Sequence, residues 1–257
     1  MYRSLTFVAV IALLLTLGSC RSAKPLQREL NTLRSQMYYE LTSPVYTGEV
    51  KDTVYMDFID YSNMNYVTSI HRKGGYFIPL ILFNLQRDNF SLLLGERSLN
   101  YLYREFLTEA LLTECNSSTC FQLADNSDAM VNPDSVYRLE IKVRKNETVG
   151  GISILNILML GLYWEYVESR STIYHPSITD LLISVRLTHA GDCLLDKTYE
   201  IKYKQPVMGR NDFYETDALQ ASMDNMAESL SLSTKKIVET ICQELNLVMT
   251  HEAQAGE

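Results

Sequence analysis

The feature that most constrains the fold is a run from Tyr137 to Arg144, YRLEIKVR, in which apolar and polar residues alternate strictly. Successive side chains of a β-strand point to opposite faces, so this period of two predicts a strand with one buried and one solvated face. The same period returns in LLISVRLT and LLDKTYEIKYK, which are separated by the turn signal HAGDC. We expect these two segments to form a β-hairpin with its turn at Gly191-Asp192.

Shorter apolar segments predict the rest of a sheet. VYMDFI, VTSIH, FSLLLG and CFQLA each have the length and composition of a strand. YFIPLILF lies between two of them. We expect it at an edge of the sheet or as a lid, because Pro79 lacks the backbone N–H that a central strand needs.

Two segments have helical periodicity. From Ser98 to Glu114 the apolar residues fall on one face and the charged residues on the other. From about Thr216 to Leu245 an apolar stripe recurs mostly at spacings of three and four. The predicted fold class is therefore α+β or α/β, with a mixed, largely antiparallel sheet packed by two main helices.

The amino terminus, MYRSLTFVAVIALLLTLGSC, predicts a secretory signal peptide. Arg3 precedes an apolar run from Leu5 to Leu17, and small residues follow before Cys20. The run is too short for a stable membrane span. The junction LGSC resembles the lipobox of bacterial lipoproteins, which implies a diacylglycerol on the Cys20 thiol, cleavage before it and acylation of the new amino group. The alternative is an ordinary secretory signal in which this cysteine is coincidental.

The residues after Cys20 predict a location and a tether. Arg21 follows it and RSAKP contains no acidic residue. In lipoproteins an Asp there favours the inner membrane, so the resemblance implies the outer membrane, with the protein facing the periplasm. Pro25 is expected to begin a short helix that lies on the body or on the lipid. We divide the chain into a lipoprotein signal peptide (1–19), a lipid anchor and tether (20–50) and a single periplasmic domain (51–257).

The order of predicted elements resembles that of auxiliary lipoproteins of bacterial envelope systems. These include ABC-transport auxiliary lipoproteins, penicillin-binding-protein activators, the curli-export lipoprotein and the amino-terminal domain of the Tol-Pal translocation protein. The resemblance implies a non-enzymatic accessory or binding protein in cell-envelope assembly or transport, with an unidentified envelope partner. The alternative is a lipid- or glycan-binding module. The likeness is carried by residues 94–111, 137–143 and 183–200 and by the final helix.

Composition and motifs argue against several other classes. The formal net charge is −8 and no Lys/Arg cluster exceeds two consecutive residues, which argues against nucleic-acid binding. The chain contains no motif of a nucleotide-binding loop, zinc protease or serine hydrolase, so we predict no catalytic residue, no cofactor and no enzyme activity. A hydrolase would need a cleft that unites a Ser, a His and a carboxylate. Asp57 and Asp60 are expected on opposite faces of a strand.

The cysteines beyond Cys20 suggest a disulfide and no metal site. Cys115 and Cys120 are separated by NSST and would face an oxidising compartment after export, so they form a disulfide or remain two half-buried thiols. Cys193 and Cys242 are expected to be plain core residues. The spacing contains no second cysteine pair and the four histidines are dispersed, which argues against zinc.

The stretch GGISILNILMLGLYWEY, Gly150 to Tyr166, leaves two interpretations open. It is a buried segment of the core, or it is a contact surface for the membrane or a protein partner. As a helix, its apolar part would be roughly 20 Å long, against about 30 Å of hydrocarbon in a bilayer. Tyr163, Trp164 and Tyr166 gather at one end, as aromatic anchors do at membrane interfaces. These three residues are therefore the candidate contact residues.

Overall fold

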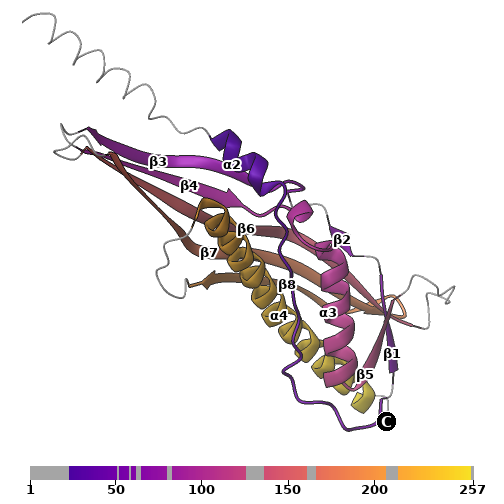
Figure 1. The fold of residues 1–257 in the computed structure, drawn as a ribbon. Helices are drawn as coiled ribbons and strands as arrows, with labels where there is room; N and C mark the ends of the chain where they lie inside the picture. The colour runs from indigo at the N-terminus through magenta and orange to yellow at the C-terminus, as the bar shows by residue number, and fades with distance from the viewer. Residues whose placement is uncertain are drawn as a thin grey trace, which may run out of the picture.

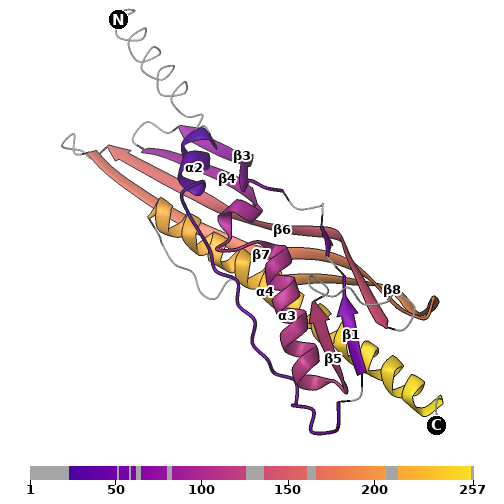
Figure 2. The same ribbon diagram turned by 90° about the vertical axis from the view of Figure 1, so that its right-hand side faces the viewer.

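The computed structural model describes residues 23–50, 52–57, 59–61, 65–79, 83–125, 136–160, 166–206 and 214–255. They form a mixed eight-stranded sheet with helices packed on one face, which confirms the predicted α+β class (Figures 1 and 2). The elements in order are α2 (Ala23–Leu30), β1 (Asp52–Met56), β2 (Asp60–Tyr61), β3 (Ser69–Pro79), β4 (Phe83–Leu93), the 3-10 turn η1 (Glu96–Ser98), α3 (Tyr103–Ser118), β5 (Phe121–Asp125), β6 (Tyr137–Leu160), β7 (Tyr166–His189), β8 (Asp192–Gln205) and α4 (Glu215–Ala255).

The alternating run found in the sequence begins β6, the strand that joins the two halves of the sheet. On one side, the first half of β6 pairs in parallel with β1 and β2, and its second half pairs antiparallel with β4. On the other side β6 pairs antiparallel with β7 over almost its whole length. Strands β5, β3 and β8 extend the sheet beyond β1, β4 and β7. The parallel pairs are therefore confined to one end.

Strands β7 and β8 form the predicted hairpin, with the turn one residue earlier than expected. Asp192 pairs with His189, so the two central turn residues are Ala190 and Gly191. Their φ angles are 51° and 88°, and a two-residue turn of this kind requires positive φ at both positions. Glycine adopts this conformation without steric cost, whereas Ala190 does so at some cost in conformational energy.

Helix α4 covers the middle of the sheet and runs to Ala255, past its predicted end at Leu245. It packs on β6, β7 and β8 and contributes much of the single apolar core (Figure 1). Several buried polar groups between helix and sheet are paired: Asn225 donates to Ser177 at 2.8 Å, and Thr179 and Ser229 share a hydrogen bond of 2.8 Å. Pairing of this kind removes the cost of burying polar atoms.

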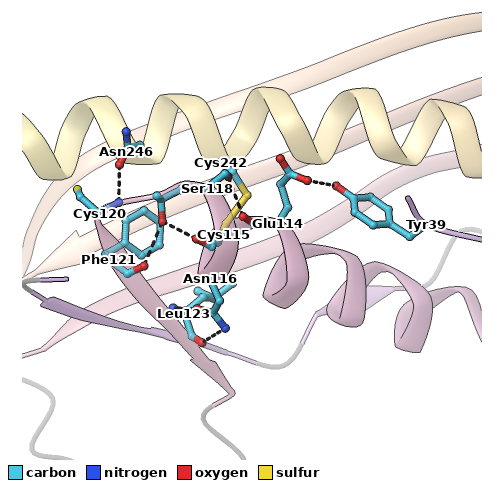
Figure 3. The surroundings of a disulfide bond; sticks show 11 residues. Tyr39, Glu114, Cys115, Asn116, Ser118, Cys120, Phe121, Leu123, Cys242 and Asn246 are labelled. Carbon is cyan, nitrogen blue, oxygen red and sulfur yellow. Dashed lines mark hydrogen bonds between the residues drawn. A yellow bond between two sulfur atoms is a disulfide. The ribbon is translucent and has the colours of Figure 1, made fainter. Parts of the chain in front are cut away.

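A disulfide joins α3 to α4, and the predicted Cys115–Cys120 pairing is wrong. Cys115 is bonded to Cys242, with their Cα atoms 5.4 Å apart (Figure 3). Helix α3 continues through Cys115 to Ser118, so the Cys115 side chain stays on the helix face that packs on α4. Cys120 follows the end of α3, where its backbone N–H donates to Asn246 at 2.8 Å. Cys120 and Cys193 are free thiols, and Cys193 is exposed, contrary to its expected place in the core.

The predicted tether helix α2 lies on the body. Leu26 and Leu30 are buried against the core. The Gln27 side chain accepts a hydrogen bond from the Ile70 backbone N–H at 3.0 Å and donates to the Thr68 carbonyl at 2.6 Å. Its amide thus pairs with the edge strand β3 as a neighbouring strand would. The segment that follows Cys20 is therefore fastened to β3.

Residues 150–160 of the apolar stretch belong to β6, and the first of them are core. Ile152 and Ile154 are fully buried. A Cβ on Gly150 would lie 2.9 Å from the Met226 side chain, and one on Gly151 would lie 2.7 Å from the Phe90 carbonyl oxygen. The two glycines therefore allow close approach of α4 on one face and of strand β4 beside it. The core interpretation thus holds for the first residues of the stretch.

Candidate functional site

The sheet extends beyond the amino-terminal end of α4, and in this part no described helix covers it (Figures 1 and 2). We call this part the blade, and it comprises residues 76–79, 83–87, 155–160 and 166–171. Its six β6 residues span roughly 20 Å at about 3.3 Å per residue. Figure 1 shows the blade at the same end of the molecule as α2.

The outer face of the blade, which points away from α4, has an apolar surface. Ile78, Leu85 and Ile157 are cross-strand neighbours on this face. In the next row, Tyr76 and Leu155 flank Arg87. Ile78 and Tyr76 are 44% and 45% exposed. Apolar side chains thus remain accessible where the helical layer has ended.

A polar group lies at the base of the blade on the same face, and we call it the outer-face cluster: Lys73, Arg87, Asn89, Ser153 and His175. Ser153 Oγ donates to Asn89 Oδ1 at 2.6 Å and lies 2.7 Å from His175 Nε2. Arg87 Nε donates to the same Asn89 oxygen at 3.2 Å. These hydrogen bonds therefore join strands β4, β6 and β7, and Lys73 adds a residue of β3.

The hydrogen bonds determine the protonation of the Ser153–His175 pair. Arg87 can only donate, so the Asn89 atom that it contacts is the amide oxygen. Ser153 gives its single hydrogen to that oxygen, and His175 Nε2 must therefore carry the hydrogen shared with Ser153. In this arrangement His175 does not act as a base toward Ser153, which a nucleophilic serine would require.

The carboxylate nearest to Asn89 in the sequence lies on the other face of the sheet. Asp88, next to Asn89 in β4, points to the opposite face, as neighbours in a strand do. It is fully buried there, 2.6 Å from the Arg72 guanidinium, and accepts a hydrogen bond from the Gln86 amide at 2.7 Å. The side chain that hydrogen-bonds to Ser153 beside His175 is thus the amide of Asn89 and not the carboxylate of Asp88.

The outer-face cluster borders a hollow of about 500 Å³, whose wall includes Lys73, Asn89, Ser91, Gly151 and His175. Burial lowers the pKa of His175, and the positive charges of Arg87 and Lys73 lower it further. The imidazole is therefore neutral near pH 7, and the two cations dominate the local charge.

Two other hollows lie near the parallel end of the sheet. One of about 690 Å³ lies beside α3, at the carboxyl ends of β1 and β5, with Met56, Ile59 and Leu112 in its wall. The second, of about 460 Å³, has Asp60 in its wall, and Asp57 lies in the wall of both hollows. The two residues do not share one strand as expected, because β1 ends at Met56 and β2 begins at Asp60. Asp60 forms an ion pair with Lys142.

Three of the residues predicted to form a site lie outside the described part of the chain. Cys20, Tyr163 and Trp164 belong to this group. Tyr166 begins β7 and pairs with Leu160 at the end of the β6–β7 ladder. The residues between Leu160 and Tyr166, which include Tyr163 and Trp164, lie outside the described part of the chain. Among the described residues, no group of His, Cys, Asp or Glu has the arrangement of a metal site, and no helix is long and apolar enough to cross a membrane.

No pattern in the sequence indicated the outer-face cluster. Its members come from four strands, and they meet only through the register of those strands. The glycine pair was visible in the sequence. A Cβ on Gly151 would lie 3.3 Å from the His175 ring. Pro176 follows at a bulge, where a residue without an N–H is tolerated.

Comparisons with known proteins give a structural similarity and no sequence match. No protein-family model matches the chain, and no curated protein matches it. Among solved structures it is similar to the crystal structure of protein XCC0632 from Xanthomonas campestris, which carries the family label DUF330. The two are 8% identical, the match covers 87% of this chain and 99% of that one, and the TM-score is 0.47.

Proposed function

We propose that this protein is a lipoprotein, anchored in the outer membrane by a lipid on Cys20 and facing the periplasm. It acts there as a non-enzymatic accessory or binding protein in cell-envelope assembly or transport. The observation that carries the proposal is the position of the blade at the end of the molecule where α2 lies (Figure 1). Cys20 precedes Ala23, the first residue of α2, by three positions, a reach of roughly 11 Å at most.

The fixed tether gives the lipid anchor a mechanical consequence. Because Gln27 fastens α2 to the edge of β3, a lipid on Cys20 holds the base of the blade close to the membrane surface. Tethering raises the local concentration of the membrane around a weakly binding surface. The exposed apolar rows of the blade are such a surface, and we propose that the membrane is what they contact.

The non-enzymatic part of the proposal is supported by the protonation of the Ser153–His175 pair. In the outer-face cluster, Ser153 donates to Asn89 and His175 donates to Ser153. The usual activation of a serine needs the reverse direction, with a carboxylate to orient the histidine. The cluster therefore favours binding over acyl transfer.

A lipid- or glycan-binding module is the second candidate function. The observation that favours it is the combination, on one face, of apolar rows with a hollow bordered by Lys73, Asn89 and Ser91. Exposed tyrosine rings such as that of Tyr76 also suit contact with lipid or sugar surfaces. An accessory protein that contacts lipid satisfies both candidates.

The anchor is tested by metabolic labelling with a clickable fatty acid. The Cys20→Ala variant should lose the label and leave the membrane fraction. Cys193→Ala is the matched control, because Cys193 is an exposed free thiol of the body. It should label like the unaltered protein. A Cys20→Ala variant that still labels would contradict the proposed anchor.

The contact surface is tested by photo-crosslinking in intact cells. A photoreactive residue at Ile78 on the blade should give adducts with lipid or an envelope protein. The control position is Leu247 on α4, which is 60% exposed and lies outside the blade. Equal adduct patterns at both positions would show that the blade is no preferred contact surface.

A further inference from the structure

We propose that the outer-face cluster binds the phosphate group of an anionic lipid headgroup. The inference deepens the proposed function and rests on it, because the anchor brings this face to the membrane. Among the described residues, neither Lys73 nor Arg87 has a carboxylate within ion-pair distance. Two cations without a described counterion, one of them in the wall of the hollow, are a favourable place for an anion.

The remaining polar groups around the hollow are suited to an anion because their unused hydrogen-bonding groups are donors. The oxygen of Asn89 is already used by Ser153 and Arg87, which leaves the hydrogens of its amide nitrogen. Arg87 uses Nε for this contact and keeps its terminal nitrogens. Lys73 and Ser91 add an ammonium and a hydroxyl to the same surroundings. Phosphate oxygens accept such hydrogen bonds, and charge strengthens them.

The placement of the apolar rows indicates that this phosphate belongs to a lipid. Leu85 precedes Asn89 by four residues along β4, roughly 13 Å at about 3.3 Å per residue. Surface-bound segments bury their apolar side chains about 5–10 Å into the boundary between headgroups and acyl chains. A blade inserted to that depth by Ile78, Leu85 and Ile157 leaves the outer-face cluster at the level of the headgroups.

The test uses the unlipidated chain 21–257, which contains every described element of the fold. Its binding to vesicles of phosphatidylglycerol and phosphatidylcholine is measured by co-sedimentation. Vesicles of phosphatidylcholine alone and free inorganic phosphate are the other two probes. A cation near an anionic surface contributes about a five-fold increase in binding, so Lys73→Gln with Arg87→Gln should weaken binding roughly 25-fold.

The matched control is Arg97→Gln with Lys204→Gln, which removes the same charge from two exposed positions outside the blade. It should bind the mixed vesicles nearly as tightly as the unaltered chain. The single variant Lys73→Gln, at an exposed position, should lose about five-fold and guards against a folding defect in the double variant.

Two results would overturn the inference. Equal losses in the cluster and control variants would show that only net charge matters. Binding of inorganic phosphate that depends on Lys73 and Arg87, together with vesicle binding that does not, would assign the site to free phosphate. Failure of the anchor is recognised separately, because fatty-acid labelling of Cys20 does not depend on these residues.

Discussion

Strands β6 and β7 pass through two different environments, the helix-covered body and the blade. In the body, Ile183 and Val185 are buried under α4, while Arg186 points to solvent. In the blade, apolar residues such as Leu155 and Ile157 lie on the face that no described helix covers. A sheet with one helical layer is stable in water when its other face is polar. The difference supports the proposal that the blade contacts a second apolar environment.

The β6–β7 ladder changes register twice before it reaches the blade. The β6–β7 register shifts between Val143 and Lys145 and again between Val149 and Gly151. A bulge adds a residue to one strand, and it reverses which side chains face the core. The strict alternation that begins β6 therefore cannot continue into the blade. The packing there has to be read from the structure.

The largest contrast between body and blade is expected in stability. Phe106→Ala removes a fully buried ring of α3 and should lower the free energy of unfolding by about 3–5 kcal/mol. Ile78→Ala changes a side chain that is 44% exposed in the blade and should cost well under about 1 kcal/mol. Denaturant unfolding of both variants measures the contrast. Similar losses at the two positions would mean that the blade is part of the core.

The next largest effect concerns the disulfide of the body. Cys242→Ser opens a link across 127 residues and should lower the free energy of unfolding by about 2–5 kcal/mol. Cys120→Ser is the control and should change little, since Cys120 is a free thiol. Peptide mapping without reduction identifies the bonded pair. A Cys115–Cys120 peptide would contradict the pairing between α3 and α4.

The periodicity of apolar residues in the sequence was sufficient to predict the main elements of the body. The alternation from Tyr137 and the helical stripes of α3 and α4 predicted the strand and both helices, because one face of each is buried and the other solvated. The disulfide was not predictable from spacing, because Cys242 is close to Cys115 only after α3 and α4 have packed. The residues around each cysteine therefore do not indicate that the two pair.

The blade and its cluster were harder to predict for a related reason. The apolar run after Gly151 was recognised as unusual, yet its length as a helix was the wrong measure, since the segment is a strand. Ser153 and His175 meet across a ladder whose register contains a bulge, which no alternation rule anticipates. The contact-surface hypothesis for Tyr163, Trp164 and Tyr166 stays a prediction.

The smallest effect is a pH dependence at the base of the blade. The pKa of folded His175 lies below the ordinary value of 6.5, so below that pH the unfolded chain binds a proton that the folded chain does not. Stability should therefore fall as the pH drops through 6.5. His175→Gln lacks this group and should lose less stability over the same range. Thermal unfolding of both proteins across that pH range tests the sign, and equal slopes would contradict it.

The most direct test of the blade as a membrane contact is the fluorescence of Trp164. It is the only tryptophan, and it lies in the segment that connects β6 to β7. In the unlipidated chain its emission should be that of a solvent-exposed indole and should shift to the blue when vesicles of phosphatidylglycerol and phosphatidylcholine are added. Trp164→Ala should then cost well under about 1 kcal/mol of stability. A blue emission without vesicles, unaltered by their addition and joined to a loss of about 3–5 kcal/mol in Trp164→Ala, would contradict the account and assign the segment to the core.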